Sequence, residues 1–346
     1  MKSADDIVEE GGFVLLEKTK SIDEKKIKEG RIPRTIDAAY AEKDGMVYLE
    51  DGPDSGKNAD NPMSFEVMDM EGIEIEALDP MAIDLDTLPE GYVNFLYTGA
   101  PLTWLETLGG LGSIVAVVDT GTVPNVCLNH AVIGAPGYPD GYNATGDGIP
   151  ATSPLNHWHG TFVGGVIASA CALNLPPDSA LYQAISAYLP WPPFFVPIIG
   201  QAPLAQLYPV KVFPATGEGV PTSVILDGLD HILDLKLSGA LDIDIVNMSL
   251  GGPTVFDGRD TFDLFIRELK KAKMLVVTSA GNEGPIPNSV GSPATSYDSI
   301  SVGALDYAIS SRILYEYLGL AYWPGTPGQG MVMRPTDETR VANFSS

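Results

Sequence analysis

The sequence predicts an α/β fold in which a mostly parallel, twisted sheet is flanked by helices. Three runs of apolar, largely β-branched residues occupy residues 114–118, 243–250 and 274–278. Continuous runs of this kind are typical of strands that are buried on both faces. Two segments between them, residues 222–237 and 261–272, repeat their apolar side chains at helical spacing. Strands that alternate with helices favour a parallel sheet that is covered on both sides.

Each element has its own pattern. The first strand run ends at Asp119, and the second is interrupted by Asp244. The two helical stripes consist of Ile225, Leu229, Ile232 and Leu233, and of Phe262, Phe265, Ile266 and Leu269. The small apolar series over residues 163–168 suits a helix packed tightly on the sheet. Residues 1–95 are acidic and weakly periodic, so we expect an N-terminal extension there, either a propeptide or an accessory segment, followed by the main domain over residues 96–346.

Composition limits the classes of partner. With 346 residues and 45% hydrophobic side chains, the chain can bury an ample core. Its 20 basic and 45 acidic side chains give a formal charge of −25, which would repel nucleic-acid phosphates and anionic lipids. Residues 179–210 carry no charge and are long enough to cross a membrane, but six prolines interrupt them, at positions 190, 192, 193, 197, 203 and 209. We therefore expect neither nucleic-acid binding nor a membrane span.

The cysteines and the N-terminus bear on the compartment. Cys127 and Cys171 form either one disulfide or two buried thiols, and without a CxxC spacing they do not indicate a metal site. The first ten residues lack the apolar core of a secretory signal. Either the protein is intracellular or its natural start lies upstream.

The candidate chemistry lies where apolar runs end. In an open parallel sheet, ligands bind beyond the carboxyl ends of the strands. Asp119 ends the first run, and the loop that contains Asn282 follows the third. Of the four histidines, only His159 is followed by Gly-Thr and then by the small apolar series. Taken singly, Asp119 fits a turn residue and His159 fits a structural histidine, so their combination and order carry the signal.

That combination resembles the subtilisin-like serine peptidases, the subtilase family. The strings that carry the resemblance are VVDTG at 117–121, HGTFVGG at 159–165, VNMSLGG at 246–252 and TSAGNEGP at 278–285. The resemblance extends over about residues 100–346. It implies a serine endopeptidase that acts on polypeptides, with Asp119 orienting His159, His159 as general base and Asn282 as an oxyanion donor. It also implies a secreted or cell-surface setting and no cofactor for the chemistry.

The resemblance also assigns a substrate cleft. Ser249, Leu250 and Gly251 match the family strand that pairs with the substrate backbone, whereas Gly217 and Gly219 match the opposite wall. Substrate would then bind as an added antiparallel strand. His157 is the rival for the general-base role, but it lacks the Gly-Thr suffix that follows His159.

Two features depart from the family pattern. No Gly-Thr-Ser-x-Ala string, which holds the family's nucleophile, occurs in the chain. We expect the serine to lie beyond Ser346, with the missing C-terminal part as a partner, and we expect the 346-residue chain alone to be inactive. The second departure is the apolar insertion at residues 181–195, where many relatives place a calcium loop. A structural calcium ion elsewhere stays possible, and residues 51–60 offer oxygen donors without the spacing of a defined calcium loop.

Two other interpretations compete. The chain could be a peptide-binding or assembly component that kept the cleft without catalysis. Alternatively, Asp119-Thr-Gly121 and Asp54-Ser-Gly56 resemble the paired motifs of an aspartic peptidase, although no apolar strand precedes Asp54. The aspartic-peptidase interpretation assigns no role to His159 or to the Asn282 loop.

Overall fold

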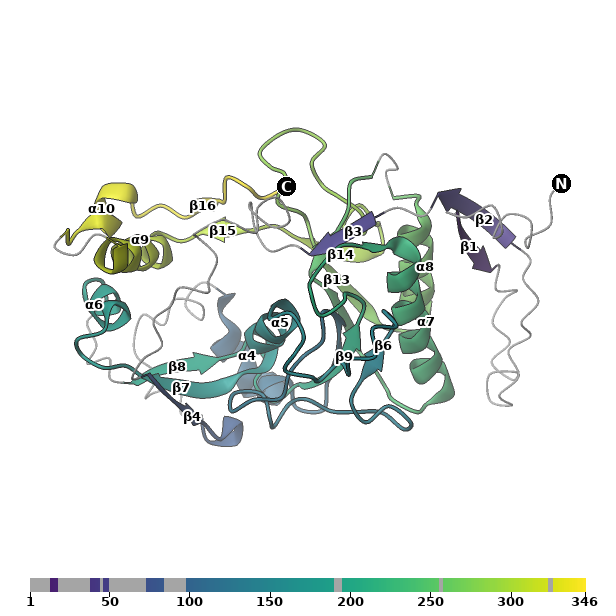
Figure 1. Ribbon diagram of the computed structural model, residues 1–346, viewed down its shortest axis with the longest axis horizontal. Coiled ribbons are helices and arrows are strands. Elements are labelled where there is room, and N and C mark those ends of the chain that lie inside the picture. The colour runs from purple at the N-terminus through teal and green to yellow at the C-terminus, as the bar shows by residue number, and fades with distance from the viewer. Residues whose placement is uncertain are drawn as a thin grey trace.

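A six-stranded, all-parallel sheet forms the centre of the molecule in the computed structural model (Figure 1). The structure describes residues 13–17, 38–43, 46–49, 73–83, 98–189, 195–254, 258–322 and 326–346. In spatial order the strands are β14 (Ser299–Val302), β13 (Leu275–Ser279), β11 (Ile245–Met248), β5 (Ile114–Asp119), β9 (Gln206–Lys211) and β6 (Tyr142–Asn143). The α/β fold with a parallel sheet is thus confirmed, and the three apolar runs supply three of its four inner strands, β5, β11 and β13.

The central strand β5 shows why its sequence is apolar throughout. Val115 and Val117 face one hydrophobic cluster, whereas Ala116 and Val118 face another on the opposite side of the sheet. All four side chains are buried. Successive side chains of a strand point to opposite faces, so a strand that is covered on both faces needs apolar residues at every position.

Three helices cover the two faces (Figure 1). One face carries α7 (Thr222–Ser238) and α8 (Thr261–Lys271), and the other carries α5 (His159–Ala168). The predicted stripes of α7 and α8 are buried at Ile225, Leu229, Ile232, Phe262 and Ile266, among others. Helix α8 begins with a reciprocal capping box between Asp260 and Asp263. Helices α7 and α8 thus begin at the residues where their patterns predict, Thr222 and Thr261.

A smaller lobe lies at one end of the sheet (Figure 1). It contains a three-stranded antiparallel sheet of β4 (Glu74–Ala77), β7 (Ala170–Asn174) and β8 (Phe195–Ile199). The helices α6 (Ala180–Ser186), α9 (Ala308–Tyr322) and α10 (Gln329–Met333) pack together beside it. The apolar insertion therefore packs over the domain, with Ile185 and Leu189 in a hydrophobic cluster that also contains Ile309. Its central residues 190–194 lie outside the described part of the chain.

A disulfide and the pairing of N-terminal strands join segments that are distant in the sequence. Cys127 and Cys171 form a disulfide across 44 residues of sequence, which settles the pairing that the sequence left open. The N-terminal part contributes strands as well. A hairpin of β1 (Phe13–Glu17) and β2 (Ala38–Lys43) contacts α8, and β3 (Met46–Leu49) pairs with strands of the main domain. The division at residue 95 stays a prediction.

Candidate active site

Asp119 and His159 form a buried pair at the carboxyl end of β5. The Nδ1 atom of His159 lies 2.8 Å from Oδ1 and 2.9 Å from Oδ2 of Asp119. The carboxylate is fully buried, and His159 is 4% exposed. Oδ1 also accepts a hydrogen bond from the backbone N–H of Thr120 at 2.7 Å. A carboxylate held in this way favours the imidazole tautomer that carries its hydrogen on Nδ1, which leaves Nε2 as the basic atom.

The start of α5 sets the position of His159. A Cβ atom on Gly160 would lie 2.1 Å from the carbonyl oxygen of Gly121 and 3.0 Å from Asp119. Only glycine therefore lets the first turn of α5 approach the end of β5 this closely. The Thr120 hydroxyl strengthens this junction, because it accepts from the Gly160 N–H at 3.0 Å and donates to the His157 carbonyl at 2.8 Å.

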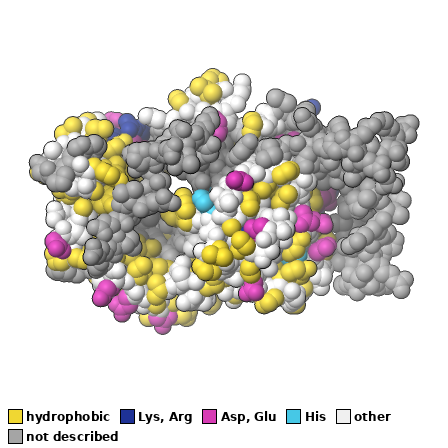
Figure 2. All heavy atoms as spheres, viewed as in Figure 1, with side chains coloured by type: hydrophobic (Ala, Val, Ile, Leu, Met, Phe, Trp, Pro, Cys, Tyr) yellow, Lys and Arg dark blue, Asp and Glu magenta, His cyan; other side chains and the backbone are white. Residues whose placement is uncertain are grey.

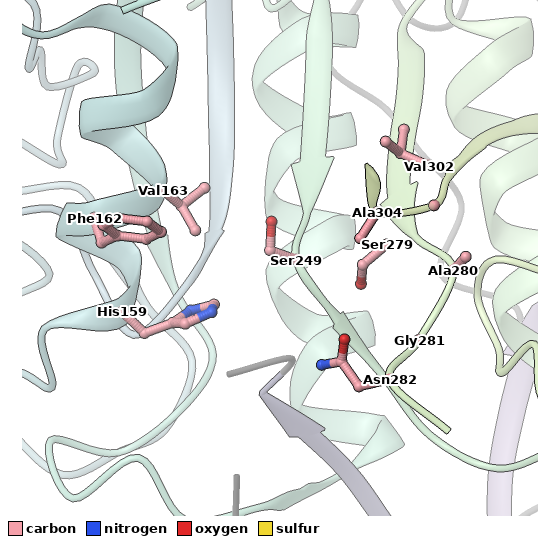
Figure 3. A pocket seen from close by; sticks show the side chains of 11 residues that line it. His159, Phe162, Val163, Ser249, Ser279, Ala280, Gly281, Asn282, Val302 and Ala304 are labelled. Carbon is pink, nitrogen blue, oxygen red and sulfur yellow. The ribbon is translucent and has the colours of Figure 1, made fainter. Parts of the chain in front are cut away.

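A pocket of about 210 Å³ opens beside this pair. On the side of α5 it is lined by His159, Phe162 and Val163. The far side consists of Ser249 with residues 279–282 and 302–304. In Figure 3, His159 and Asn282 extend from opposite sides toward the space between them. Figure 2 shows this face hollowed beside a histidine side chain, with hydrophobic, uncharged and acidic side chains on the coloured surface next to it.

Asn282 lies on the loop after β13. Its backbone N–H donates to the Glu283 carboxylate at 2.9 Å, and the Glu283 N–H donates to the Ser346 hydroxyl at 3.1 Å. The backbone N–H of Ser346 in turn donates to the Gly281 carbonyl at 3.1 Å. The loop is thus fixed by the Glu283 side chain and by Ser346, while the Asn282 amide extends into the pocket (Figure 3).

A strand of the same chain runs between the segments that the resemblance predicts as cleft walls. Leu250 and Gly251 form the short strand β12, which pairs antiparallel with β3. On its other edge β3 pairs antiparallel with β10 (Val220–Pro221), which directly follows Gly217 and Gly219. The order β10-β3-β12 therefore places β3 along the course predicted for substrate.

The hydroxyls of the other serines near the site form hydrogen bonds with neighbouring residues. Ser249 Oγ accepts from the Asn247 side chain at 3.2 Å, and Ser279 Oγ donates to the Leu250 carbonyl at 3.4 Å. Ser345 Oγ accepts from the Ala304 N–H at 3.0 Å. Sequence reasoning missed two contributors to the site, Thr120 and Phe162. Thr120 was visible as the middle residue of the Asp-Thr-Gly string, whereas nothing marked Phe162 before the helix was placed.

The structure bears on the rival residues and sites that the sequence offered. The ring nitrogen that lies 2.8 Å from the Asp119 carboxylate belongs to His159, whereas the His157 carbonyl accepts a hydrogen bond from the Thr120 hydroxyl. Asp54, the second aspartate of the aspartic-peptidase interpretation, lies outside the described residues, as do residues 51–60 with their oxygen donors. Within the described ranges, no group of three or more His, Cys, Asp or Glu side chains is placed to hold a metal ion. In the same ranges, no helix is both long and apolar enough to cross a membrane.

Comparison with known proteins identifies the family. The subtilase family model matches residues 110–346. Serine protease AprX of Bacillus subtilis (strain 168) is 32% identical over 206 residues, which cover 58% of this chain and 40% of that protein. Pyrolysin of Pyrococcus furiosus is 29% identical over 75% of this chain and 17% of its own length. Subtilisin BL of Lederbergia lenta is 31% identical over 60% of this chain and 61% of its own length.

The chain thus spans less than two thirds of each of these relatives. Among solved structures, sphericase aligns with a TM-score of 0.44 at 24% identity, over 69% of this chain and 60% of that one. Because the family model covers well over half of the chain, the conclusion rests on that match and on the order of the four strings. The chain belongs to the subtilase family.

Proposed function

We propose that this chain carries the acid–base and oxyanion-binding parts of a serine endopeptidase. The observation that carries the proposal is the buried contact of Asp119 with His159 Nδ1, beside a pocket that also receives Asn282. In the proposed reaction, Nε2 of His159 takes the proton of a serine hydroxyl while the serine oxygen attacks the substrate carbonyl carbon. The Asn282 amide donates to the carbonyl oxygen as it becomes negative.

The remaining steps use the same groups. His159 gives its proton to the leaving amine, the C–N bond breaks, and an acyl-enzyme remains. Water then attacks the acyl carbon with His159 again as base, which releases the new carboxyl end and restores the serine. None of these steps consumes a cofactor. Asp119 stays ionised throughout and stabilises the transient imidazolium.

We propose that the serine is supplied by residues that follow Ser346. The hydroxyls of Ser249, Ser279, Ser345 and Ser346 each have a hydrogen-bond partner outside the Asp119–His159 pair, and we assign the nucleophile to none of them. Two apolar side chains of the pocket lining, Phe162 and Val302, are 61% and 50% exposed. A further segment that packs on them would bury both and reach His159. The 346-residue chain alone should then cleave no peptide bond.

For substrate, we propose a polypeptide bound as an antiparallel strand between β12 and β10. The support is β3, which pairs with both of these strands through backbone registers at Leu250↔Leu49 and Val220↔Val47. Backbone pairing is insensitive to side-chain identity, so it suits a general polypeptide substrate. It follows that β3 competes with substrate, and we propose that this part of the N-terminal extension is inhibitory while it remains in place.

The test is to express the chain with its natural continuation and to treat it with a fluorophosphonate probe, which reacts with activated serines. We expect one labelled serine beyond residue 346, no labelling in His159→Ala, and undiminished labelling in the matched control His157→Ala. The 346-residue chain should stay unlabelled. A folded, continued chain that resists the probe even after removal of residues 1–49, which include β3, would refute the peptidase proposal.

That negative outcome would favour the second candidate, a peptide-binding component without catalysis. The same observation, β3 held in the cleft, is what favours it. A fluorescent peptide with the sequence of β3 that binds a chain lacking catalysis would support it. We place either form of the protein outside the cell or on its surface, because the Cys127–Cys171 disulfide persists in oxidising compartments.

A further inference from the structure

Residues 214–219 form the cleft wall that leads into β10, the strand that pairs with β3. A carboxylate that does not line the pocket holds this wall in place. Asp147 lies on the loop that follows β6, and its Oδ2 atom accepts from Lys211 Nζ at 2.6 Å and from the Ala215 N–H at 3.2 Å. Its Oδ1 atom accepts from the Asn143 side chain at 2.8 Å and from the Ile149 N–H at 2.9 Å. One carboxylate therefore joins the loop, the end of β9 and the turn that begins the wall.

The cation of this group is unusual in its burial. Lys211 is the last residue of β9 and is fully buried. It stands opposite Asp119 in the parallel register, and the Val212 N–H that follows it donates to the Asp119 carbonyl at 2.8 Å. A buried ammonium group requires an anion and satisfied hydrogen bonds. Asp147 supplies the anion and one hydrogen bond, and the Ile149 carbonyl accepts a second one at 3.4 Å, at the point where the chain leaves β9 for the turn.

The same loop also contacts the far end of the turn. Gly217 closes the turn by donating its N–H to the Pro214 carbonyl at 2.9 Å, and it has a φ of +75°. A Cβ atom there would lie 2.9 Å from Cδ2 of His157. The turn is thus held at its base by Asp147 and packed at its tip against His157, whose carbonyl is tied to Thr120. The strand β10 begins three residues later.

We propose that Asp147 is a positioning residue that fixes the wall over residues 214–219, so that β10 can pair with a strand in the cleft. It touches neither His159 nor a reacting atom, and it acts through Lys211 and Ala215. The proposal rests on the proposed function insofar as the paired strand is substrate. Loss of the carboxylate should loosen the wall and weaken backbone pairing, while the Asp119–His159 pair keeps its geometry.

The test uses amide hydrogen exchange on the 346-residue chain. In Asp147→Asn, amides of residues 215–219 should exchange at least about tenfold faster, with those of β5, β11 and β13 unchanged, because local opening is separable from global unfolding. Asp242→Asn is the matched control. It removes a carboxylate that pairs with Lys236 at 2.5 Å on the far end of α7, and it should leave the wall unchanged. Equal exchange of the wall in Asp147→Asn and wild type would overturn the proposal.

A second variant separates positioning from charge neutralisation. The double variant Asp147→Asn/Lys211→Met removes the buried cation, so it should fold even if Asp147→Asn alone does not. We expect its wall amides to remain fast, because an amide oxygen replaces the charged acceptor of the Ala215 N–H. Wild-type protection in the double variant would mean that Asp147 only neutralises Lys211, and would also overturn the proposal.

Hydrogen exchange of the β3 amides distinguishes a failure of this proposal from a failure of the proposed function. If residues 46–49 exchange freely in the wild-type chain, the inhibitory role of β3 fails, yet residues 215–219 still report on Asp147. In a continued, active chain, Asp147→Asn should raise KM about tenfold with kcat changed less than about twofold. A fall in kcat at unchanged KM would assign Asp147 to the chemistry and contradict a role in holding the wall.

Discussion

Both carboxylate oxygens of Asp119 lie within 2.9 Å of Nδ1 of His159, and the carboxylate has no exposure to solvent. A buried carboxyl oxygen that accepts at this atom holds the proton on Nδ1, because the alternative tautomer would place two acceptors in contact. The Thr120 N–H shares Oδ1, which fixes the carboxylate without competing for the imidazole ring. In the proposed reaction, the pair therefore prepares Nε2 as a base before any substrate binds.

Replacing Asp119 by Asn should make Nε2 of His159 unavailable as a base without unfolding the site. The Asn oxygen can still accept from Thr120, but its NH₂ group would face Nδ1 and force the opposite tautomer. In the continued chain we expect fluorophosphonate labelling to slow by roughly 10⁴-fold, the size of loss measured when subtilisin itself lacks its triad aspartate. Unchanged thermal unfolding would show that the fold survives. Labelling within a factor of ten of wild type would contradict the orienting role.

The disulfide should contribute strongly to stability, because the loop that it closes contains the whole of α5. A cross-link over 44 residues removes chain entropy from the unfolded state worth about 4 kcal/mol in the loop-closure treatment. We expect Cys127→Ala/Cys171→Ala to lower the free energy of unfolding, measured by urea titration, by about that amount. Reducing agent should lower it similarly in the wild type and leave the double variant unaffected. Coincident urea curves for the oxidised wild type and the variant would contradict the prediction.

The fold and the central site were predictable because their signals are local. Strand β5 is buried on both faces, so its apolar run is continuous and ends where Asp119 must turn toward the site. His159 and Asn282 stand in short strings whose glycines are required by close contacts, as at Gly160. A reader of the sequence alone can therefore find these three residues and the order in which they occur.

The contacts of the cleft wall and of β3 were not predictable in the same way. The four residues of β3 have no pattern of their own, and their partner strands lie more than 170 residues further along the chain. Asp147 is one of 45 acidic residues, and only the buried Lys211 distinguishes it. Helix α9 buries Arg312 and Glu316 in a polar network, so its pattern does not resemble an apolar stripe.

A buried histidine should give the fold an acid-sensitive component. His231 stacks on Tyr142 with ring centroids 3.9 Å apart, and its Nε2 atom lies 2.8 Å from the Tyr208 hydroxyl. Burial lowers the pKa of His231 to about 4, with Asp227 opposing the shift. Neutral His231 therefore contributes its full share to the free energy of unfolding above pH 6.5. This contribution is lost as the pH falls from about 6.5 to 4, because His231 is protonated first in the unfolded chain.

The variant His231→Gln keeps a partner for Tyr208 and removes the titration. Its packing cost is independent of pH, so the slope of stability against pH is the informative measurement. Between pH 6.5 and 4 the wild type should lose on the order of 2 kcal/mol more than the variant in urea unfolding. Parallel curves for the two proteins would show that His231 titrates alike in the folded and unfolded states.

Asp263 should act in the same pH window with the opposite sign. The capping box places its carboxylate against Asp260, and the residue is 1% exposed. Burial first, and then the Asp260 charge, raise the pKa of Asp263 to about 7. The folded state therefore holds a proton that the unfolded state releases near pH 4, so stability falls as the pH rises from about 4 to 7 and is level above.

Asp263→Asn should reverse this loss while keeping the cap, since an amide oxygen can still accept from the Asp260 N–H. We expect the variant to be more stable than wild type at pH 8, by on the order of 2 kcal/mol, and to be equal to it near pH 4, where the wild-type carboxyl is protonated. Urea unfolding at the two pH values measures both. A variant that is less stable than wild type at pH 8 would contradict this prediction, because it would mean that the ionised Asp260–Asp263 pair is stabilised by its surroundings. Asp263 would then not oppose the rise in stability that His231 produces between pH 4 and 6.5.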